Sequence, residues 1–199
     1  LADAHQVLVD RSLGGGAQGV LEQGVHLGRC EHLAGDLVGM RDVLLHAYHH
    51  YAGNGKKYEA IILLLPTAPF RTGADITNAI RIYESGNNID MVVSVTEAKA
   101  NPYFSLFEEN SEGFLRQSKQ GLFLRRQECP HVYQYNGAVY VIRTSSLLNH
   151  EMNAFDRIVK YIMPDERSVD IDSPLEWQIA EYLMALRQDK KHTQQKNTL

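Results

Sequence analysis

Cysteine is scarce in this sequence, which has only Cys30 and Cys129 among its 199 residues. Two cysteines so far apart, outside any metal-ligand spacing, indicate neither a disulfide framework nor a zinc site. A reducing cytoplasm is therefore the expected compartment. No apolar run approaches the roughly 18 residues of a membrane span, and no secretory leader pattern opens the sequence, so we expect no membrane association.

An excess of positive charge is also lacking, because 20 Lys and Arg face 24 Asp and Glu, giving a net charge of −4. This balance argues against a nucleic-acid partner. Any phosphate ligand would have to be bound by a few cationic groups at specific positions. The length and the 44% hydrophobic content are those of one globular domain.

Residues 1–30 lack Ile, Phe, Tyr, Trp, Lys and Pro, yet they hold six of the fifteen glycines. Gly14–Gly16 are only a weak match to a phosphate-binding loop, since no Lys-Ser/Thr follows them. We therefore divide the chain into an atypical Gly-rich segment (1–30), a domain (31–187) with an arm at about 103–126, and a polar tail (188–199) that we expect to fray.

Apolar periodicity predicts helices and strands in alternation. Residues 39–51 repeat apolar side chains at helical spacing, and residues 58–65 form a nearly continuous apolar run typical of a buried strand. Thr72 and Asp75 predict a capping box that opens the next helix, and a Val-rich strand follows at 91–96. A strand–helix–strand unit favours parallel strands, so we expect a doubly wound α/β fold with a mostly parallel sheet.

The later sequence is less regular. Short aromatic pieces separated by polar residues predict a strand-rich arm over 103–126. A strand at 138–143 and a helix at 145–159 should follow. Ser173, Pro174 and Glu176 together predict the start of another helix.

Two carboxylates precede that helix. In a short strand, Asp170 and Asp172 would lie on one face, and Mg²⁺ commonly uses one or two carboxylates together with substrate phosphates. The alternative is that Asp172 only begins the turn and favours the helix dipole.

Other polar residues could contact a ligand. Arg71 lies just past the carboxyl end of a predicted buried strand, where open α/β sheets bind ligands. Arg126, beside Gln127, is a second candidate for binding an anion. Each arginine could equally be an exposed residue paired with a carboxylate. Asn136-Gly137 is foremost a turn pattern.

Taken together, these pieces resemble the acylneuraminate cytidylyltransferases over about 140 residues. The matching stretches, in order, are Leu64–Arg71, Val92–Glu97, Arg126-Gln127 with Pro130, Asn136–Tyr140 and Asp170–Pro174. The resemblance implies a Rossmann-like, nucleotide-diphospho-sugar transferase-like fold with a β-rich dimerisation arm. It implies transfer of CMP from CTP to the anomeric hydroxyl of a nonulosonic acid such as N-acetylneuraminic acid, with release of pyrophosphate.

The resemblance also implies roles for single residues. Asp170 and Asp172 would hold Mg²⁺ on the triphosphate, while Arg126, Gln127, Asn136 and Tyr140 would line or shape the side that binds the sugar acid. Arg71 matches a loop arginine that either touches the substrate or braces the loop. A homodimer is the expected assembly.

Two of the places where the sequence departs from the family bear on its function. It contains no Ile-Pro-Ala-Arg-x-Gly-Ser-Lys-like loop, which in the family grips CTP, and Leu65 stands where many members have Gln. Truncation, a shifted reading frame and divergence into a non-catalytic sugar- or nucleotide-binding dimer all explain the first departure. The second keeps pseudaminic and legionaminic acids open as substrates.

Overall fold

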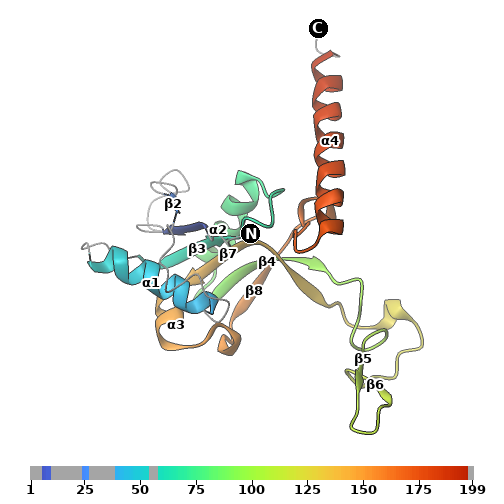
Figure 1. Ribbon diagram of the computed structural model, residues 1–199. Coiled ribbons are helices and arrows are strands. Elements are labelled where there is room, and N and C mark those ends of the chain that lie inside the picture. Colours follow the sequence, from blue (N-terminus) through green and yellow to red (C-terminus); the bar gives the residue numbers. More distant parts are fainter. Residues whose placement is uncertain (1–5, 10–23, 27–38, 54–57, 197–199) are drawn as a thin grey trace.

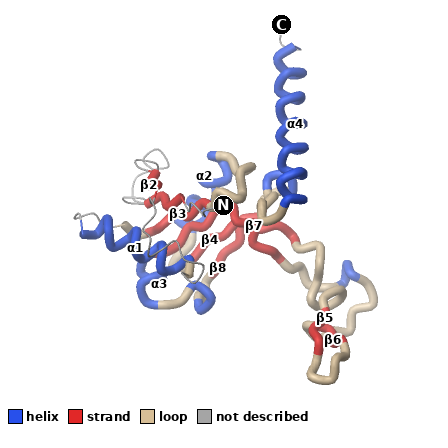
Figure 2. Tube along the Cα trace, in the orientation of Figure 1, coloured by secondary structure: helices blue, strands red, loops and turns tan. Residues whose placement is uncertain are grey.

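The computed structural model describes residues 6–9, 24–26, 39–53 and 58–196. They form an α/β domain on one six-stranded mixed sheet, with strand order β2-β1-β3-β7-β4-β8 (Figure 1). Helices pack beside the sheet, while a small hairpin and a long helix project away from it (Figures 1 and 2). The α/β class predicted from the sequence is confirmed.

The predicted strand–helix–strand unit is present. β3 (Ala60–Leu64) is buried at every residue, as its unbroken aliphatic sequence predicts. α2 (Gly73–Ser85) begins with the predicted capping box, in which the Asp75 carboxylate accepts a 2.7 Å hydrogen bond from Thr72 N. β4 (Met91–Glu97) follows α2 and runs in the same direction as β3.

The sheet is not mostly parallel, which corrects the prediction from the sequence. β7 (Tyr133–Arg143) lies between β3 and β4 and is antiparallel to both. β1 (Gln6–Val9) is antiparallel to β3 and to β2 (Gly24–His26). Among the strands that the structure describes, only β4 and β8 (Ile158–Ile162) pair in parallel. The reason is that the chain leaves β4 into the arm, reverses there and returns beside β4 as β7.

Two apolar clusters hold the helices to the sheet. Ala79 and Ile80 of α2 share one cluster with alternate residues of β3 and with several apolar residues of β7. Leu44 and Ala47 of α1 (Met40–Gly53) share the other with the apolar residues on the opposite face of those strands. Full burial of one such aliphatic side chain stabilises the fold by about 1.5–3 kcal/mol, so this double packing fixes the sheet that carries the site.

The predicted helix over 145–159 is much shorter in the structure. α3 spans Thr144–Asn149, a single 3-10 turn follows at Met152–Ala154, and β8 then joins the sheet edge. Asp90 holds this segment against the sheet, because its carboxylate accepts hydrogen bonds from the side chains of Arg157 and Ser146 at 3.1 and 2.7 Å. These contacts between distant residues outweigh local helix propensity.

The arm over 103–126 contains the predicted strands. β5 (Phe107–Glu109) and β6 (Leu115–Gln117) form an antiparallel hairpin outside the main sheet, and Figure 1 shows it well away from the domain. The Asn110 side chain accepts hydrogen bonds from two backbone N–H groups of the turn, and Gly113 adopts φ +83° there. This arm is followed by a 3-10 turn at Arg126–Glu128.

α4 (Pro174–Lys196) is a long helix that projects from the domain (Figure 1). It extends into the segment predicted as a polar tail. Near its middle, Ala180 is buried, and the Arg187 guanidinium lies over the Phe70 ring at 4.5 Å. In the described part of the chain, none of the helices is long and apolar enough to cross a membrane.

Candidate functional site

Three segments meet past the carboxyl end of β3, a central strand: the loop after β3, a bulge in β7, and the chain before α4. Ile171 N donates a 2.9 Å hydrogen bond to the Thr67 carbonyl, which joins the third segment to the first. The predicted short strand over 170–172 is absent, so this bond holds an irregular segment in place. Backbone that is not committed to a sheet ladder can present its side chains to a ligand.

Arg71 braces the first segment from within. Its Nη1 donates to the carbonyls of Leu65 and Ala68 at 2.6 and 2.7 Å, and Ala68 and Phe70 are buried. Burial lowers the pKa of the Arg71 guanidinium below its usual value. The sequence left open whether Arg71 touches the substrate or braces the loop, and its hydrogen bonds in the structure are those of a bracing residue.

Asn136-Gly137 is a bulge within β7 rather than the predicted turn between elements. The pairing of β7 with β4 shifts register between Val93 and Val95, and Gly137 adopts φ +69° there. A Cβ on residue 137 would lie 2.7 Å from Asp170 Oδ2. Glycine is required at this position both by its backbone angle and by the close approach of Asp170.

The Asn136 amide is fixed by hydrogen bonds. Its Oδ1 accepts from Ser94 Oγ at 2.6 Å, and its Nδ2 donates to Ser168 Oγ at 2.8 Å. Ser94 Oγ also accepts from Val139 N at 2.7 Å. Because Asn136 is 3% exposed, it shapes the bulge from inside. Neither serine was singled out from the sequence, although Ser94 stands out as the polar residue in a Val-rich strand.

Asp170 has a buried oxygen, Oδ1, with no hydrogen-bond partner. The charge of this carboxylate affects Tyr140. Burial is the largest cause that raises the pKa of Tyr140 to about 12, and the charges of Asp170 and Tyr135 add to it. The tyrosine therefore stays a neutral phenol at physiological pH. An unpaired buried carboxylate oxygen is costly, and an oxygen-preferring cation such as Mg²⁺ would satisfy it.

Asp172 is exposed at the start of α4. Its backbone N–H donates to the Glu176 carboxylate at 2.8 Å, and Ser173 Oγ accepts from Glu176 N at 3.4 Å. The predicted N-terminal cap is confirmed, with the reciprocal bond made to Asp172. Within the described residues, no three His, Cys, Asp or Glu gather into a metal cluster. A cation bound by Asp170 and Asp172 would thus need phosphate and water ligands as well, as Mg²⁺ commonly does.

A second network, missed in the sequence, holds the chain that leads to Asp170. Asp75, 1% exposed, accepts from Arg167 Nη2 at 3.0 Å and from Tyr161 OH at 2.9 Å. Burial by itself raises the pKa of Asp75, but hydrogen bonds from Thr72, Arg167 and Tyr161 lower it overall. A buried carboxylate that accepts several hydrogen bonds and an ion pair in this way favours one geometry of the segment it joins.

Arg126 and Gln127 lie apart from these residues, at the base of the arm. They line a pocket of about 370 Å³, whose polar members also include Glu97, Asn101, Cys129 and His131. Arg126 Nη2 donates to the Lys99 carbonyl, and His131 Nδ1 lies 2.8 Å from Glu97 Oε1. In the described part of the chain, no hydrogen bond or ion pair joins Arg126 or Gln127 to Asp170.

Comparison with known proteins gives consistent relatives, although no protein-family model matches the sequence. The post-translational flagellin modification protein B of Campylobacter coli is 31% identical over 157 residues, and the CMP-N,N'-diacetyllegionaminic acid synthase of Campylobacter jejuni is 32% identical over 160. These alignments cover 77% and 78% of the chain but 65% and 66% of the relatives. The chain thus spans just under two thirds of their length.

The N-acylneuraminate cytidylyltransferase of Escherichia coli is 29% identical over 154 residues, which is 76% of this chain and 35% of that protein. A matched stretch of this length within 199 residues must include the loop after β3 and the β7 bulge. Over 76–78% of its length, the chain is therefore similar to proteins named as a CMP-N,N'-diacetyllegionaminic acid synthase and an N-acylneuraminate cytidylyltransferase.

Proposed function

We propose that this chain carries the sugar-activating site of an enzyme that transfers CMP from CTP to a nonulosonic acid. The anomeric hydroxyl oxygen forms a bond to the α-phosphorus, the bond from that phosphorus to the bridging oxygen of pyrophosphate breaks, and the hydroxyl proton is released. The observation that carries this proposal is the unpaired buried oxygen of Asp170 beside Gly137. The names of the relatives support the same chemistry.

Asp170 and Asp172 are the residues that would hold Mg²⁺. The ion would neutralise charge on the triphosphate and on the departing pyrophosphate. Asp170 is held for this task by the close fit to Gly137 and by the Ile171–Thr67 bond. Tyr140 serves as a hydrogen-bond donor rather than a base, because its pKa of about 12 keeps its proton in place.

The remaining predicted site residues divide into supports and ligand contacts. Arg71 and Asn136 position the loop and the bulge, since their polar atoms bind the protein itself. Arg126 and Gln127 are the candidates for contacting the sugar acid, because they line a pocket and a guanidinium can bind a carboxylate with two parallel hydrogen bonds. Transfer between two bound substrates depends mainly on such positioning.

The acid is a nonulosonic acid, and Leu65 bears on which one. Leu65 cannot hydrogen-bond a polar sugar substituent, and its half-buried side chain packs against the apolar cluster on the α1 side of the sheet. We therefore propose a legionaminic-type acid as a substrate alongside N-acetylneuraminic acid. A relative named as a legionaminic acid synthase supports this choice.

The arm is proposed to join two copies of the chain. Seven of its large apolar side chains are 39–104% exposed, among them Leu122 and Leu124, which contact almost nothing. Contiguous exposed apolar surface on this scale marks an interaction site. The alternative function, a non-catalytic dimer that binds sugar or nucleotide, is favoured by one observation: the sequence contains no Gly-Ser-Lys-type loop.

Pyrophosphate release separates the two functions. The assay contains CTP, Mg²⁺ and a panel of nonulosonic acids, and compares this chain with a longer one in which a family-type nucleotide loop precedes residue 31. Release by either chain that depends on the acid supports the enzyme. Binding of CTP or acid by both chains without any release favours the non-catalytic dimer.

A further inference from the structure

Two polar atoms in the segment before α4 are buried and have no hydrogen-bond partner. One is Asp170 Oδ1, an acceptor, and the other is Arg167 Nε, a donor. The two residues are three positions apart, so their Cα atoms are separated by at most about 11 Å of chain. An arginine has one of the longest side chains and could cover much of that distance. A donor and an acceptor that lie so near in the chain and both stay unbonded call for a physical cause.

Asp75 holds Arg167 in another direction. Asp75 Oδ1 accepts hydrogen bonds from Arg167 Nη2 at 3.0 Å and from Tyr161 OH at 2.9 Å. Asp75 Oδ2 accepts two more, each of 2.7 Å, from N and Oγ1 of Thr72. Because Asp75 lies in the first turn of α2 and is 1% exposed, its carboxylate is fixed in place. The Arg167 guanidinium is therefore bound 92 residues back in the chain, rather than three residues ahead.

Other bonds fix the backbone that carries Asp170. Arg167 N donates to the Pro164 carbonyl at 3.0 Å within a 3-10 turn at Asp165–Arg167. Ser168 Oγ accepts from the Asn136 amide at 2.8 Å, and Ile171 N donates to the Thr67 carbonyl at 2.9 Å. None of these three bonds uses the side chain of Asp75 or Arg167. Loss of the Asp75–Arg167 pair would therefore free a guanidinium and leave this backbone held.

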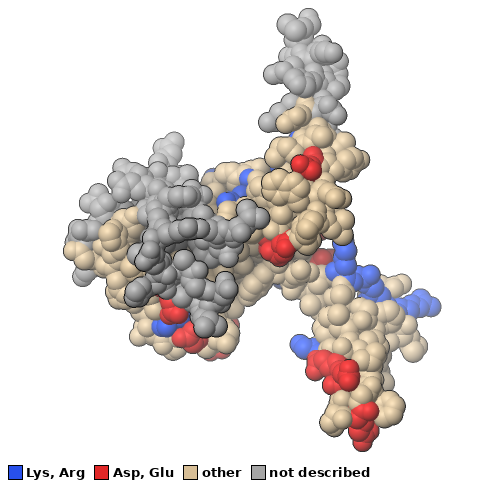
Figure 3. All heavy atoms as spheres, in the orientation of Figure 1, with Lys and Arg blue, Asp and Glu red and all other residues tan. Residues whose placement is uncertain are grey.

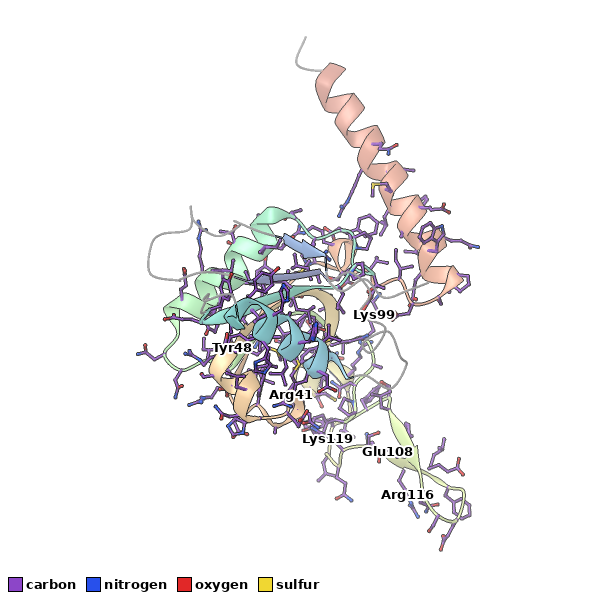
Figure 4. The ribbon with its side chains drawn as sticks, turned by 60° about the vertical axis from the view of Figure 1, so that its left-hand side comes forward. Arg41, Tyr48, Lys99, Glu108, Arg116 and Lys119 are labelled. Atoms are coloured by element: carbon purple, nitrogen blue, oxygen red, sulfur yellow. The ribbon has the colours of Figure 1, made fainter. Side chains whose placement is uncertain are left out.

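Lys99 is a second cation beside the same segment, on its solvent side. Its Nζ lies 3.8 Å from Asp165 Oδ2, but the two side chains are 89% and 68% exposed. Figure 4 shows Lys99 near the start of α4, and Figure 3 shows Lys and Arg atoms on the surface where the arm leaves the domain. Water and salt screen such exposed charges, whereas a guanidinium inside the protein acts strongly on a buried carboxylate. Of these two cations, Arg167 is the stronger competitor for Asp170.

We propose that Asp75 is a positioning residue that keeps Arg167 away from Asp170 and so leaves the Asp170 carboxylate available to a divalent cation. A freed Arg167 would donate to Asp170 Oδ1, the same oxygen that the cation needs. This inference rests on the proposed metal role of Asp170. It adds a residue on α2 that acts through Arg167 and binds neither the cation nor a substrate.

Binding of Mn²⁺ alone tests the proposal, because Mn²⁺ takes the same oxygen ligands as Mg²⁺ and EPR counts the free ion. The full chain would be compared with Asp75→Asn, Arg167→Gln and the double variant. The amide is neutral and has one acceptor oxygen, so it cannot hold Thr72 and Arg167 as the carboxylate does. We expect Asp75→Asn to raise the Mn²⁺ Kd at least about fivefold. The double variant should restore the wild-type Kd, since no guanidinium is left to compete.

This restoration separates the proposed role from a merely structural one. If the pair only stiffened the segment, Arg167→Gln would weaken Mn²⁺ binding and the double variant would be no better than Asp75→Asn, and either result would overturn the inference. Arg167→Gln decides alone if Asp75→Asn does not fold. Tyr161→Phe is the matched control, because it removes the other donor to Asp75 Oδ1 without freeing a cation, and its Kd should equal that of wild type.

Asp170→Asn distinguishes this inference from the proposed function. If Asp170→Asn weakens Mn²⁺ binding while Asp75→Asn leaves it unchanged, the metal role of Asp170 stands and the role of Asp75 is overturned. If Asp170→Asn binds Mn²⁺ as tightly as wild type, both are overturned. A crystal structure of Asp75→Asn gives a second reading without any metal: we expect the Arg167 guanidinium within hydrogen-bond distance of Asp170, and a guanidinium still directed at residue 75 would contradict the proposal.

Discussion

Gly137 and Asp170 fit together so closely that a Cβ atom on residue 137 would lie 2.7 Å from Asp170 Oδ2. The two residues are more than thirty positions apart in the chain, and they come from a strand bulge and from the segment before α4. Their fit leaves the other carboxylate oxygen, Oδ1, buried and without a hydrogen-bond partner. The proposed metal role of Asp170 depends on this arrangement.

Gly137→Ala should therefore damage both the fold and the site. The alanine would have to adopt φ +69°, and its methyl group would displace Asp170. Together these effects should lower the free energy of unfolding by about 1–3 kcal/mol. Urea denaturation measures this loss. Gly73→Ala is the matched control, because nothing lies within 4 Å of its Cβ position in α2, and we expect no loss there. Equal stability of the two variants would refute the close fit.

The strand–helix–strand unit could be predicted because its signals are local. The apolar run of β3 and the Thr72–Asp75 capping box depend on neighbouring residues alone. The order of the strands has no such local signal, because β7 lies between β3 and β4 only as a result of the reversal of the chain in the arm. The same holds for the helix expected over 145–159, which long-range bonds to Asp90 shorten.

Arg71 is expected to act on the loop rather than on the substrate. Arg71→Ala removes the donor for two carbonyls and should lower the free energy of unfolding by about 1–3 kcal/mol. Arg71→Lys keeps the charge but cannot span both carbonyls equally well, so we expect a partial loss. Arg81→Ala, at an exposed position of α2, controls for removing an arginine. The bracing role would be wrong if Arg71→Ala unfolded at the same urea concentration as Arg81→Ala.

Acid should weaken the anchor between β4 and β8. Hydrogen bonds from Arg157 lower the pKa of Asp90 to about 2 against the opposing effect of burial, with a further contribution from Ser146. A lowered folded-state pKa gives stability that is present above about pH 4 and is lost as the pH falls towards 2. Because Arg157 is half exposed, we expect only about 1–2 kcal/mol.

The measurement is the pH dependence of urea unfolding for wild type and Asp90→Asn. The variant should be less stable near pH 7 and should lose less stability between pH 5 and pH 2.5. If the free energy of unfolding changed equally with pH in the two proteins, the titration of Asp90 would not contribute to the loss of stability in acid.

The serine pair around Asn136 offers a test of positioning. Ser168→Ala removes the acceptor of the Asn136 Nδ2 donor and should loosen the bulge beside Asp170. We expect a several-fold higher Mg²⁺ requirement for pyrophosphate release with little change in the KM for the sugar acid. Ser145→Ala, at an exposed position of α3, is the control. An unchanged Mg²⁺ requirement in Ser168→Ala would show that the bond is only structural.

The candidate site was predictable in part. Asp170, Asn136 and Tyr140 stand in stretches that resemble a known family, so sequence alone singled them out. Ser168 and the Asp75–Arg167 pair could not be found in this way, because their partners lie 32 and 92 residues away. Arg126 was also predicted, but its position in a separate pocket follows from the course of the arm.

The central claim is that Asp170 serves CMP transfer, and the most direct test is formation of the CMP-linked sugar from CTP and a nonulosonic acid. Wild type, Asp170→Asn and Asp165→Asn would be compared at several Mg²⁺ concentrations in the chain that carries a nucleotide loop. Asp165 is a suitable control because its side chain is 68% exposed. We predict Mg²⁺-dependent product with wild type and Asp165→Asn and at least about a hundredfold less with Asp170→Asn. Equal product from all three would contradict the claim.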